Sequence, residues 1–235
     1  MHATEAAATR NAAVQLNAGA HSATRIVVST FGALVAFAGI EHGVGEIPQG
    51  PVAPGGLAIE SWPDVKAFEI LAGEPAMTLI PNLLLTGVLA VIVALALGIW
   101  SAMFVERRDG GPVLIALSVL LLLVGRGFAP PLMGIILGIA ATRIGAISRR
   151  EPGGVARAMG RVWPWALSAG VLGYLGLFPG LVLASWLFGV SDSNLVLGLS
   201  AVSFAALLLA PAAARAHDRT QAADRSGRDA TKARR

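Results

Sequence analysis

The stretch LLLTGVLAVIVALALGIW, residues 83–100, carries no charged side chain. A helix needs roughly 20 mostly apolar residues to cross the hydrocarbon core of a bilayer, and this stretch comes close to that length. Hydrophobic residues make up 55% of the whole chain and charged residues 14%, whereas soluble domains carry about 25% charged residues. A single soluble core could not hide so much apolar surface. The sequence therefore predicts an all-α fold, a polytopic transmembrane helical bundle.

About six apolar segments fit this prediction, and polar turns, loops and prolines separate them. We expect membrane spans at residues 26–41, 76–105, 112–129, 131–148, 162–190 and 195–213. Pro179, which lies within the fifth segment, predicts a kink there.

The region 112–148 allows two interpretations. A single helix of this length would exceed about 50 Å at 1.5 Å per residue, which is too long for one crossing. Pro130 and Pro131 would also break such a helix. The chain could form a helical hairpin, or two half-helices that meet inside the membrane. Both arrangements return the chain to the side it left.

The basic residues predict which side of the membrane each segment faces. With six spans, every Lys and Arg except Lys66 and Arg126 falls on one side, and such an excess marks the cytoplasmic side. Both termini are therefore expected in the cytoplasm. The predicted regions are a disordered tail at 1–25, a transmembrane domain at 26–213 with an extracytoplasmic loop at 44–74, and a basic disordered tail at 214–235.

The positive charge needs no nucleic-acid partner. The net charge is +4, and attraction of the cytoplasmic basic residues to anionic lipid accounts for it. We expect the lipid bilayer as partner and no nucleic acid. The sequence leaves open a homo-oligomer or a membrane partner protein.

Several enzyme classes are disfavoured by what the sequence lacks. It contains no cysteine, which excludes disulfides and cysteine metal sites. It contains no G-x-x-x-x-G-K-[ST], H-E-x-x-H or G-x-G-x-x-G motif, which argues against an ATPase, a zinc protease or a dinucleotide enzyme. We therefore predict no cofactor, no metal site and no catalytic residue.

Three segments carry a resemblance to known proteins. GIEHGVGEIPQG (39–50), ESWPD (60–64) and GEPAMTLIPN (73–82) resemble a family of small uncharacterised bacterial multi-span membrane proteins. The resemblance covers about residues 30–148 and leaves 160–213 outside. It implies a multi-pass protein of the bacterial cytoplasmic membrane and implies no activity.

Ionisable residues gather at the outward end of the first span and in the following loop. A carboxylate and an imidazole near the membrane boundary can relay protons or bind a cation. The alternative is that Glu41 and His42 cap the helix and pair locally. We predict an ion or substrate vestibule that comprises Glu41, His42, Glu46, Glu69, Glu74, Asn82 and Arg126.

Arg126 lies inside an apolar stretch, and such a charge usually has a partner in the bundle interior. We expect an ion pair with Glu41, because the predicted topology puts both near the outer boundary. Glu74 and Glu46 are competing partners. The alternative is that Arg126 extends to the outer headgroups.

Small residues recur at helical spacing in two spans, which allows another helix to approach closely. We expect each ridge to pack against a neighbouring helix, and we expect the two to form a close pair. The ridges comprise Gly32, Ala36, Gly39 and Gly43, and Gly134, Gly138, Ala141 and Gly145.

The loop from Ser61 onward is predicted to be helical, with Trp62, Val65, Phe68 and Leu71 on one face. This helix would either shield helix ends or gate a site. The leading functional hypothesis is a small, non-enzymatic membrane protein of transporter or channel type. The alternatives are a structural or regulatory membrane subunit and an intramembrane enzyme that uses His42 and a carboxylate.

Overall fold

A computed structural model describes residues 22–145 and 151–233 of the chain. Within these ranges, the description leaves out a few side chains. Those side chains belong to Arg126, Asp229, Ala230, Lys232 and Ala233. The predicted tail before residue 22 and the end of the predicted span 131–148 lie outside the described residues.

The described chain is mostly helical, and four helical stretches are long and apolar enough to cross a membrane. Large side chains on them are exposed, such as Ile92 and Leu172 at 56% and 69%, as expected of surfaces that face lipid. The structure thus supports a multi-pass membrane protein. The four stretches are α2 (Ala23–Glu46) with η1 (Ile47–Gln49), α4 (Leu83–Met103), the run α8 (Trp163–Leu175), η2 (Gly176–Leu181) and α9 (Val182–Phe188), and α10 (Ser193–Ala233).

Two shorter apolar helices, α5 (Gly110–Leu123) and α6 (Ala129–Ala141), form a hairpin. At 1.5 Å per residue they are about 20 Å long, which is shorter than the roughly 30 Å hydrocarbon core. The region is broken into two helices, as predicted, but the break lies earlier than predicted. The three-residue strand β3 (Val124–Arg126) separates them, and Pro130 and Pro131 lie in the first turn of α6.

A small antiparallel sheet lies where the loop meets the turn of this hairpin. Its strands are β1 (Ala58–Glu60), β2 (Pro75–Thr78) and β3, in the order β1-β2-β3. The sequence did not predict this sheet. The predicted second span starts too early, because residues 75–78 pair with strands on both sides and α4 begins only after Asn82.

The loop helix predicted from Ser61 is much shorter in the structure. Only α3 (Lys66–Glu69) forms, because Asp64 has a φ of 60° and Ala72 has a φ of 55°. Such left-handed backbone is incompatible with a continuing right-handed helix. The chain on either side of α3 turns back to supply β1 and β2.

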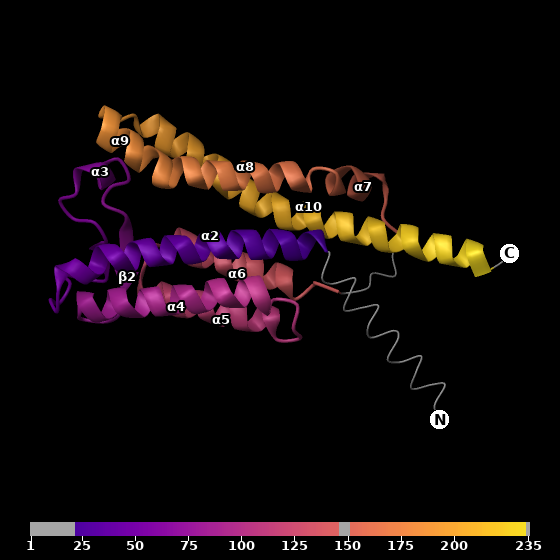
Figure 1. The fold of residues 1–235 in the computed structure, drawn as a ribbon, viewed down its shortest axis with the longest axis horizontal. Coiled ribbons are helices and arrows are strands. Elements are labelled where there is room, and N and C mark those ends of the chain that lie inside the picture. The colour runs from indigo at the N-terminus through magenta and orange to yellow at the C-terminus, as the bar shows by residue number, and fades with distance from the viewer. Residues whose placement is uncertain (1–21, 146–150, 234–235) are drawn as a thin grey trace, which may run out of the picture.

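The hydrophobic core lies between α2, α4, α5 and α6, which form one group of helices in Figure 1. Val28 and Phe31 on α2 and Leu97 on α4 are among its most buried side chains. Leu114 on α5 and Leu137 on α6 belong to the same core, which extends to Ala166 on α8 and to Leu207 and Ala210 on α10. The second group contains α8, α9 and α10, and α10 also contacts α2.

Glycines of both small-residue ridges pack against neighbouring helices, as predicted, except Gly145, which lies beyond the end of α6 and where a Cβ atom would meet nothing within 4 Å. On α2, Gly32 lies against Ser101 of α4. On α6, a Cβ atom at Gly138 would lie 2.5 Å from Ile115 Cγ1 of α5. The predicted pair is partly confirmed, because α2 contacts α6 and a Cβ atom at Gly134 would lie 3.7 Å from Val35 Cγ1 of α2. The nearest neighbours of Gly32 and Gly138, however, belong to α4 and α5.

The C-terminal half confirms one prediction and differs from another. The helical path kinks at Pro179, where Phe178 has non-helical angles. The region 214–235 was predicted to be disordered, yet α10 continues to Ala233 and projects beyond the rest of the bundle (Figure 1). Alanine and arginine are strong helix formers, and the segment is anchored because Asp218 accepts hydrogen bonds from the first amides of α2.

Candidate functional site

His42 is buried near the loop end of α2, with only 3% of its surface exposed. Its Nδ1 atom lies 2.9 Å from the carbonyl oxygen of Ala38 and 2.9 Å from Glu41 Oε2. A carbonyl and a carboxylate can only accept hydrogen bonds, so Nδ1 carries a hydrogen. The two contacts of Nδ1 fix the orientation of the ring, so Nε2 is the ring nitrogen that can gain or lose a hydrogen.

The Nε2 atom of His42 lies 3.3 Å from Glu74 Oε2. In a neutral imidazole with a hydrogen on Nδ1, Nε2 carries a lone pair, which would face the lone pairs of a carboxylate. A proton held by either group converts this contact into a hydrogen bond. The geometry of the pair therefore suits a proton shared between an imidazole and a carboxylate.

Glu74 reaches His42 from an unusual turn. Ala72, Gly73 and Glu74 have φ values of 55°, 71° and 54°, a left-handed run that is unfavourable for residues with a Cβ atom. Two backbone hydrogen bonds hold the turn in place, from Trp62 N to Gly73 O and from Ser61 N to Glu74 O. Strain of this kind persists where the surroundings enforce it, and it is often found at functional sites.

Trp62 covers the cluster from the loop side. Its Nε1–H donates a hydrogen bond to Glu41 Oε1, and its ring stacks on Phe68 with centroids 4.7 Å apart. Gly45 permits this contact, because a Cβ atom there would lie 2.6 Å from the Trp62 ring. Glu41 is thus held by two donors, Trp62 Nε1 and His42 Nδ1.

A hollow of about 320 Å³ lies on the outer side of Trp62. Its lining includes three carboxylates, from Glu60, Asp64 and Glu69. All three residues are exposed. Of the residues predicted to form an acidic vestibule, Glu69 lines this hollow, whereas Glu41, His42 and Glu74 cluster on the other side of Trp62. The vestibule itself stays a prediction.

Glu46 is fully buried, although it was predicted to line the vestibule. Its Oε1 atom accepts one long hydrogen bond from Ser61 Oγ at 3.4 Å, and its Oε2 atom has no hydrogen-bond partner among the described residues. Gly125 packs directly on this carboxylate with a φ of 94°, and a Cβ atom there would lie 2.5 Å from Glu46 Oε2. An ionised carboxylate buried with so few partners is energetically costly.

The remaining predicted site residues have other positions. Asn82 caps α4, since its Oδ1 atom accepts a hydrogen bond from Leu85 N at 3.0 Å. The backbone of Arg126 pairs with Met77 in the sheet, but the Arg126 side chain lies outside the described part of the structure. Its ion pair with Glu41 therefore stays a prediction.

A metal ion would find few ligands here. Glu41, His42 and Glu74 offer ligand atoms within 4.8 Å of one another. However, Glu41 lies at Nδ1 and Glu74 at Nε2, on opposite edges of the imidazole ring. An ion bound to Nε2 would therefore have Nε2 and Glu74 as ligands, while Glu41 would only accept a hydrogen bond from Nδ1. Two direct ligands are fewer than the three or four that protein zinc sites use.

The sequence interpretation missed the roles of Ser61, Trp62 and Gly127. A Cβ atom at Gly127 would lie 3.2 Å from His42 Nε2 and 2.8 Å from Pro75 O. The one available signal was Trp62, because a buried indole N–H usually finds a hydrogen-bond partner and this loop is rich in carboxylates. The sequence could not indicate the role of Gly127, because that role depends on which segment of the fold packs against it.

Comparisons with known proteins found no match to a family model, to a curated protein or to a solved structure.

Proposed function

We propose that this chain is a small membrane protein of transporter or channel type in which His42 and Glu74 bind and release a proton. The observation that supports this proposal most directly is the placement of one imidazole between two carboxylates. Its Nδ1 atom is fixed by Glu41 and Ala38, while its Nε2 atom faces Glu74. Ionisable groups buried in membrane proteins commonly form proton relays.

The outer hollow supports a route between this cluster and water. Trp62 lies between the carboxylates of the hollow and Glu41. The loop that carries Trp62 also carries Glu74, and backbone hydrogen bonds from Trp62 N to Gly73 O and from Ser61 N to Glu74 O join their two segments. A movement of this loop would therefore change both contacts of the α2 cluster together, which is how a gate would act.

For the membrane arrangement we propose six segments with both termini in the cytoplasm of a bacterial cell. In this arrangement, α5, β3 and α6 form a hairpin that leaves and returns to the cytoplasmic side. The charge pattern supports it, because the loop between α2 and α4 carries Lys66 as its only Lys or Arg, whereas the turns at the other end carry several arginines, such as Arg107 and Arg108.

Purified protein in liposomes that contain a pH-sensitive dye would test the proposal. After a pH step outside, we expect the wild-type protein to speed internal acidification and His42→Gln to remove that effect. The matched control is His217→Gln. This histidine lies near the start of α2, because its neighbour Asp218 accepts hydrogen bonds from Ala23 N and Thr24 N, whereas His42 lies near the end of α2. A flux that His42→Gln leaves unchanged would contradict the proposal.

Two further outcomes distinguish the alternatives. Wild-type liposomes without any flux would favour a structural or regulatory subunit that acts with a partner. Binding of zinc to purified protein at one equivalent, lost in both His42→Gln and Glu74→Gln, would replace the proton with a metal ion as ligand.

A further inference from the structure

We propose that a groove between α7 (Gly154–Gly160) and α10 binds the phosphate of an anionic phospholipid headgroup. This α7–α10 groove has a volume of about 470 Å³. It lies at the end of the bundle opposite the His42 cluster and does not depend on the proposed proton exchange. The groove is lined by Arg157, Gly160, Arg161, His217, Thr220, Gln221 and Asp224.

Gly160 allows the backbones of α7 and α10 to approach closely beside the groove. A Cβ atom at Gly160 would lie 2.9 Å from both the Cα and the N atoms of His217. The imidazole of His217 is then held by the Gly160 carbonyl, which lies 3.2 Å from Nδ1, and by the Trp163 ring at 5.8 Å. Since the carbonyl only accepts, Nδ1 is the donor, and Nε2 points to the side where Gln221 lies.

The charges of the groove favour an anion. Arg157 and Arg161 are four residues apart, which places them as neighbours on one helical surface. Both are exposed, and neither takes part in the ion pairs found among the described residues. Asp224 is the one carboxylate in the lining. Each guanidinium group can donate two parallel hydrogen bonds to a phosphate, so two neighbouring arginines suit a phosphate ligand.

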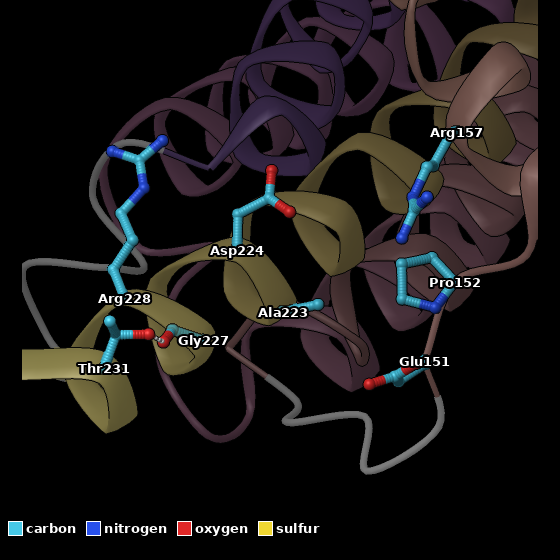
Figure 2. Close-up of a pocket in the computed structure, with 8 residues that line it drawn as sticks. All are labelled: Glu151, Pro152, Arg157, Ala223, Asp224, Gly227, Arg228 and Thr231. Atoms are coloured by element: carbon cyan, nitrogen blue, oxygen red, sulfur yellow. Dashed lines mark hydrogen bonds between the residues drawn. The ribbon is translucent and has the colours of Figure 1, made fainter. Parts of the chain in front are cut away.

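A neighbouring hollow of about 630 Å³ shares Arg157 and Asp224 with the groove. Figure 2 shows Arg157 and Asp224 on facing elements, while Glu151 and Thr231 line the part farther out along α10. The lining of this hollow adds Glu151 and Arg228, so that two carboxylates balance two arginines there. The excess of positive charge is therefore confined to the inner part, beside Arg161 and His217.

The apolar side chains next to the groove indicate its depth in a membrane. Val155 and Trp165 are 84% and 77% exposed, and Val162 is 40% exposed. Tryptophan is enriched at the level of lipid headgroups. Arg161 lies one turn before Trp165, close to the first residue of α8, Trp163. Its guanidinium group is therefore expected within reach of headgroup phosphates. Basic pockets between helices in this position are suited to anionic lipids.

The test is binding of phosphatidylglycerol to the purified full-length protein, measured by native mass spectrometry. Phosphatidylcholine with the same acyl chains and inorganic phosphate are the comparison ligands. We expect tighter binding of phosphatidylglycerol than of phosphatidylcholine, and a loss of about fivefold for each arginine removed. Arg157→Gln with Arg161→Gln should thus weaken binding roughly twenty-five-fold.

The matched control is Arg107→Gln with Arg108→Gln, which removes two exposed arginines from the turn before α5. This control should bind phosphatidylglycerol like the wild-type protein. If the double groove variant does not fold, Arg161→Gln alone should still show the fivefold loss. Equal binding of both lipids, equal loss in control and groove variants, or displacement of the lipid by an equal concentration of inorganic phosphate would overturn the proposal.

Discussion

Gly43 of α2 and Gly87 of α4 lie with their backbones in contact. A Cβ atom at Gly43 would lie 2.6 Å from the Gly87 carbonyl oxygen, and a Cβ atom at Gly87 would lie 2.7 Å from the Gly43 carbonyl oxygen. Each residue therefore excludes a side chain from the other. Since His42 precedes Gly43, this crossing also fixes the histidine relative to α4.

Replacement of Gly87 by alanine should destabilise the protein. The added methyl group would also lie 2.8 Å from Ile47 Cγ1, and overpacking of this kind typically costs about 1–3 kcal/mol. Thermal unfolding in detergent would measure the loss. The control is Gly198→Ala on α10, where a Cβ atom would meet nothing within 4 Å. Equal melting temperatures for the two variants would contradict the close crossing.

The sequence predicted this close packing because glycine spacing is a local property of a helix. It did not predict the partner helix, because Gly43 and Gly87 carry no information about each other. The sheet was missed for a related reason. β2 and β3 are only four and three residues long, and their pairing depends on how the loop folds back onto the α5–α6 hairpin.

The candidate site likewise contains features that the sequence predicted and features that it did not. The grouping of Glu41 with His42 follows from their adjacency in the sequence, and Glu74 was named as a member of the same cluster. The burial of Glu46 could not be predicted, because it results from Ser61 and Gly125, which are distant in the sequence. Similarly, the side chain of Asn82 serves as a helix cap, a role that its sequence position alone did not distinguish from a vestibule role.

Replacement of Trp62 by phenylalanine should destabilise the site while retaining the aromatic stack on Phe68. The change removes the Nε1–H donor to Glu41, and a hydrogen bond to a charged group contributes about 1.5–3 kcal/mol. Thermal unfolding in detergent would show a lower midpoint. Trp165→Phe is the control, because Trp165 is 77% exposed. A Trp62→Phe variant that melts with the wild-type protein would show that the indole N–H does not hold Glu41.

Replacement of Asp218 by alanine should loosen the contact between α2 and α10. Its two carboxylate oxygens accept hydrogen bonds from Ala23 N and Thr24 N at 2.7 and 3.0 Å. Loss of such a cap typically costs about 0.5–2 kcal/mol. Asp224→Ala, on the same helix and exposed, should cost much less. Hydrogen exchange at the first amides of α2 would locate the effect, and unchanged exchange there would argue against the contact.

The proposed topology can be tested with single cysteines, since the chain has none of its own. Ala53 and Ser226 are both exposed, whereas Ser61 is fully buried and would label poorly. With both termini in the cytoplasm, an impermeant maleimide added to intact cells should label Ala53→Cys and not Ser226→Cys. Permeabilised cells should label both. The reverse pattern in intact cells would invert the topology.

The same substitution at two positions of α2 should have opposite consequences. Glu41→Gln should destabilise the protein by about 1.5–3 kcal/mol, because the new amide N–H₂ would face His42 Nδ1–H, and the charge that Trp62 contacts is lost. Glu46→Gln should be neutral or stabilising. It replaces a fully buried carboxylate that has a single long hydrogen bond, and burial of a poorly paired charge is unfavourable. Denaturation of both variants in the same detergent would compare them directly. A Glu46→Gln variant as unstable as Glu41→Gln would mean that the Glu46 carboxylate binds a cation in the folded protein, and the ion site would then include both carboxylates of this helix.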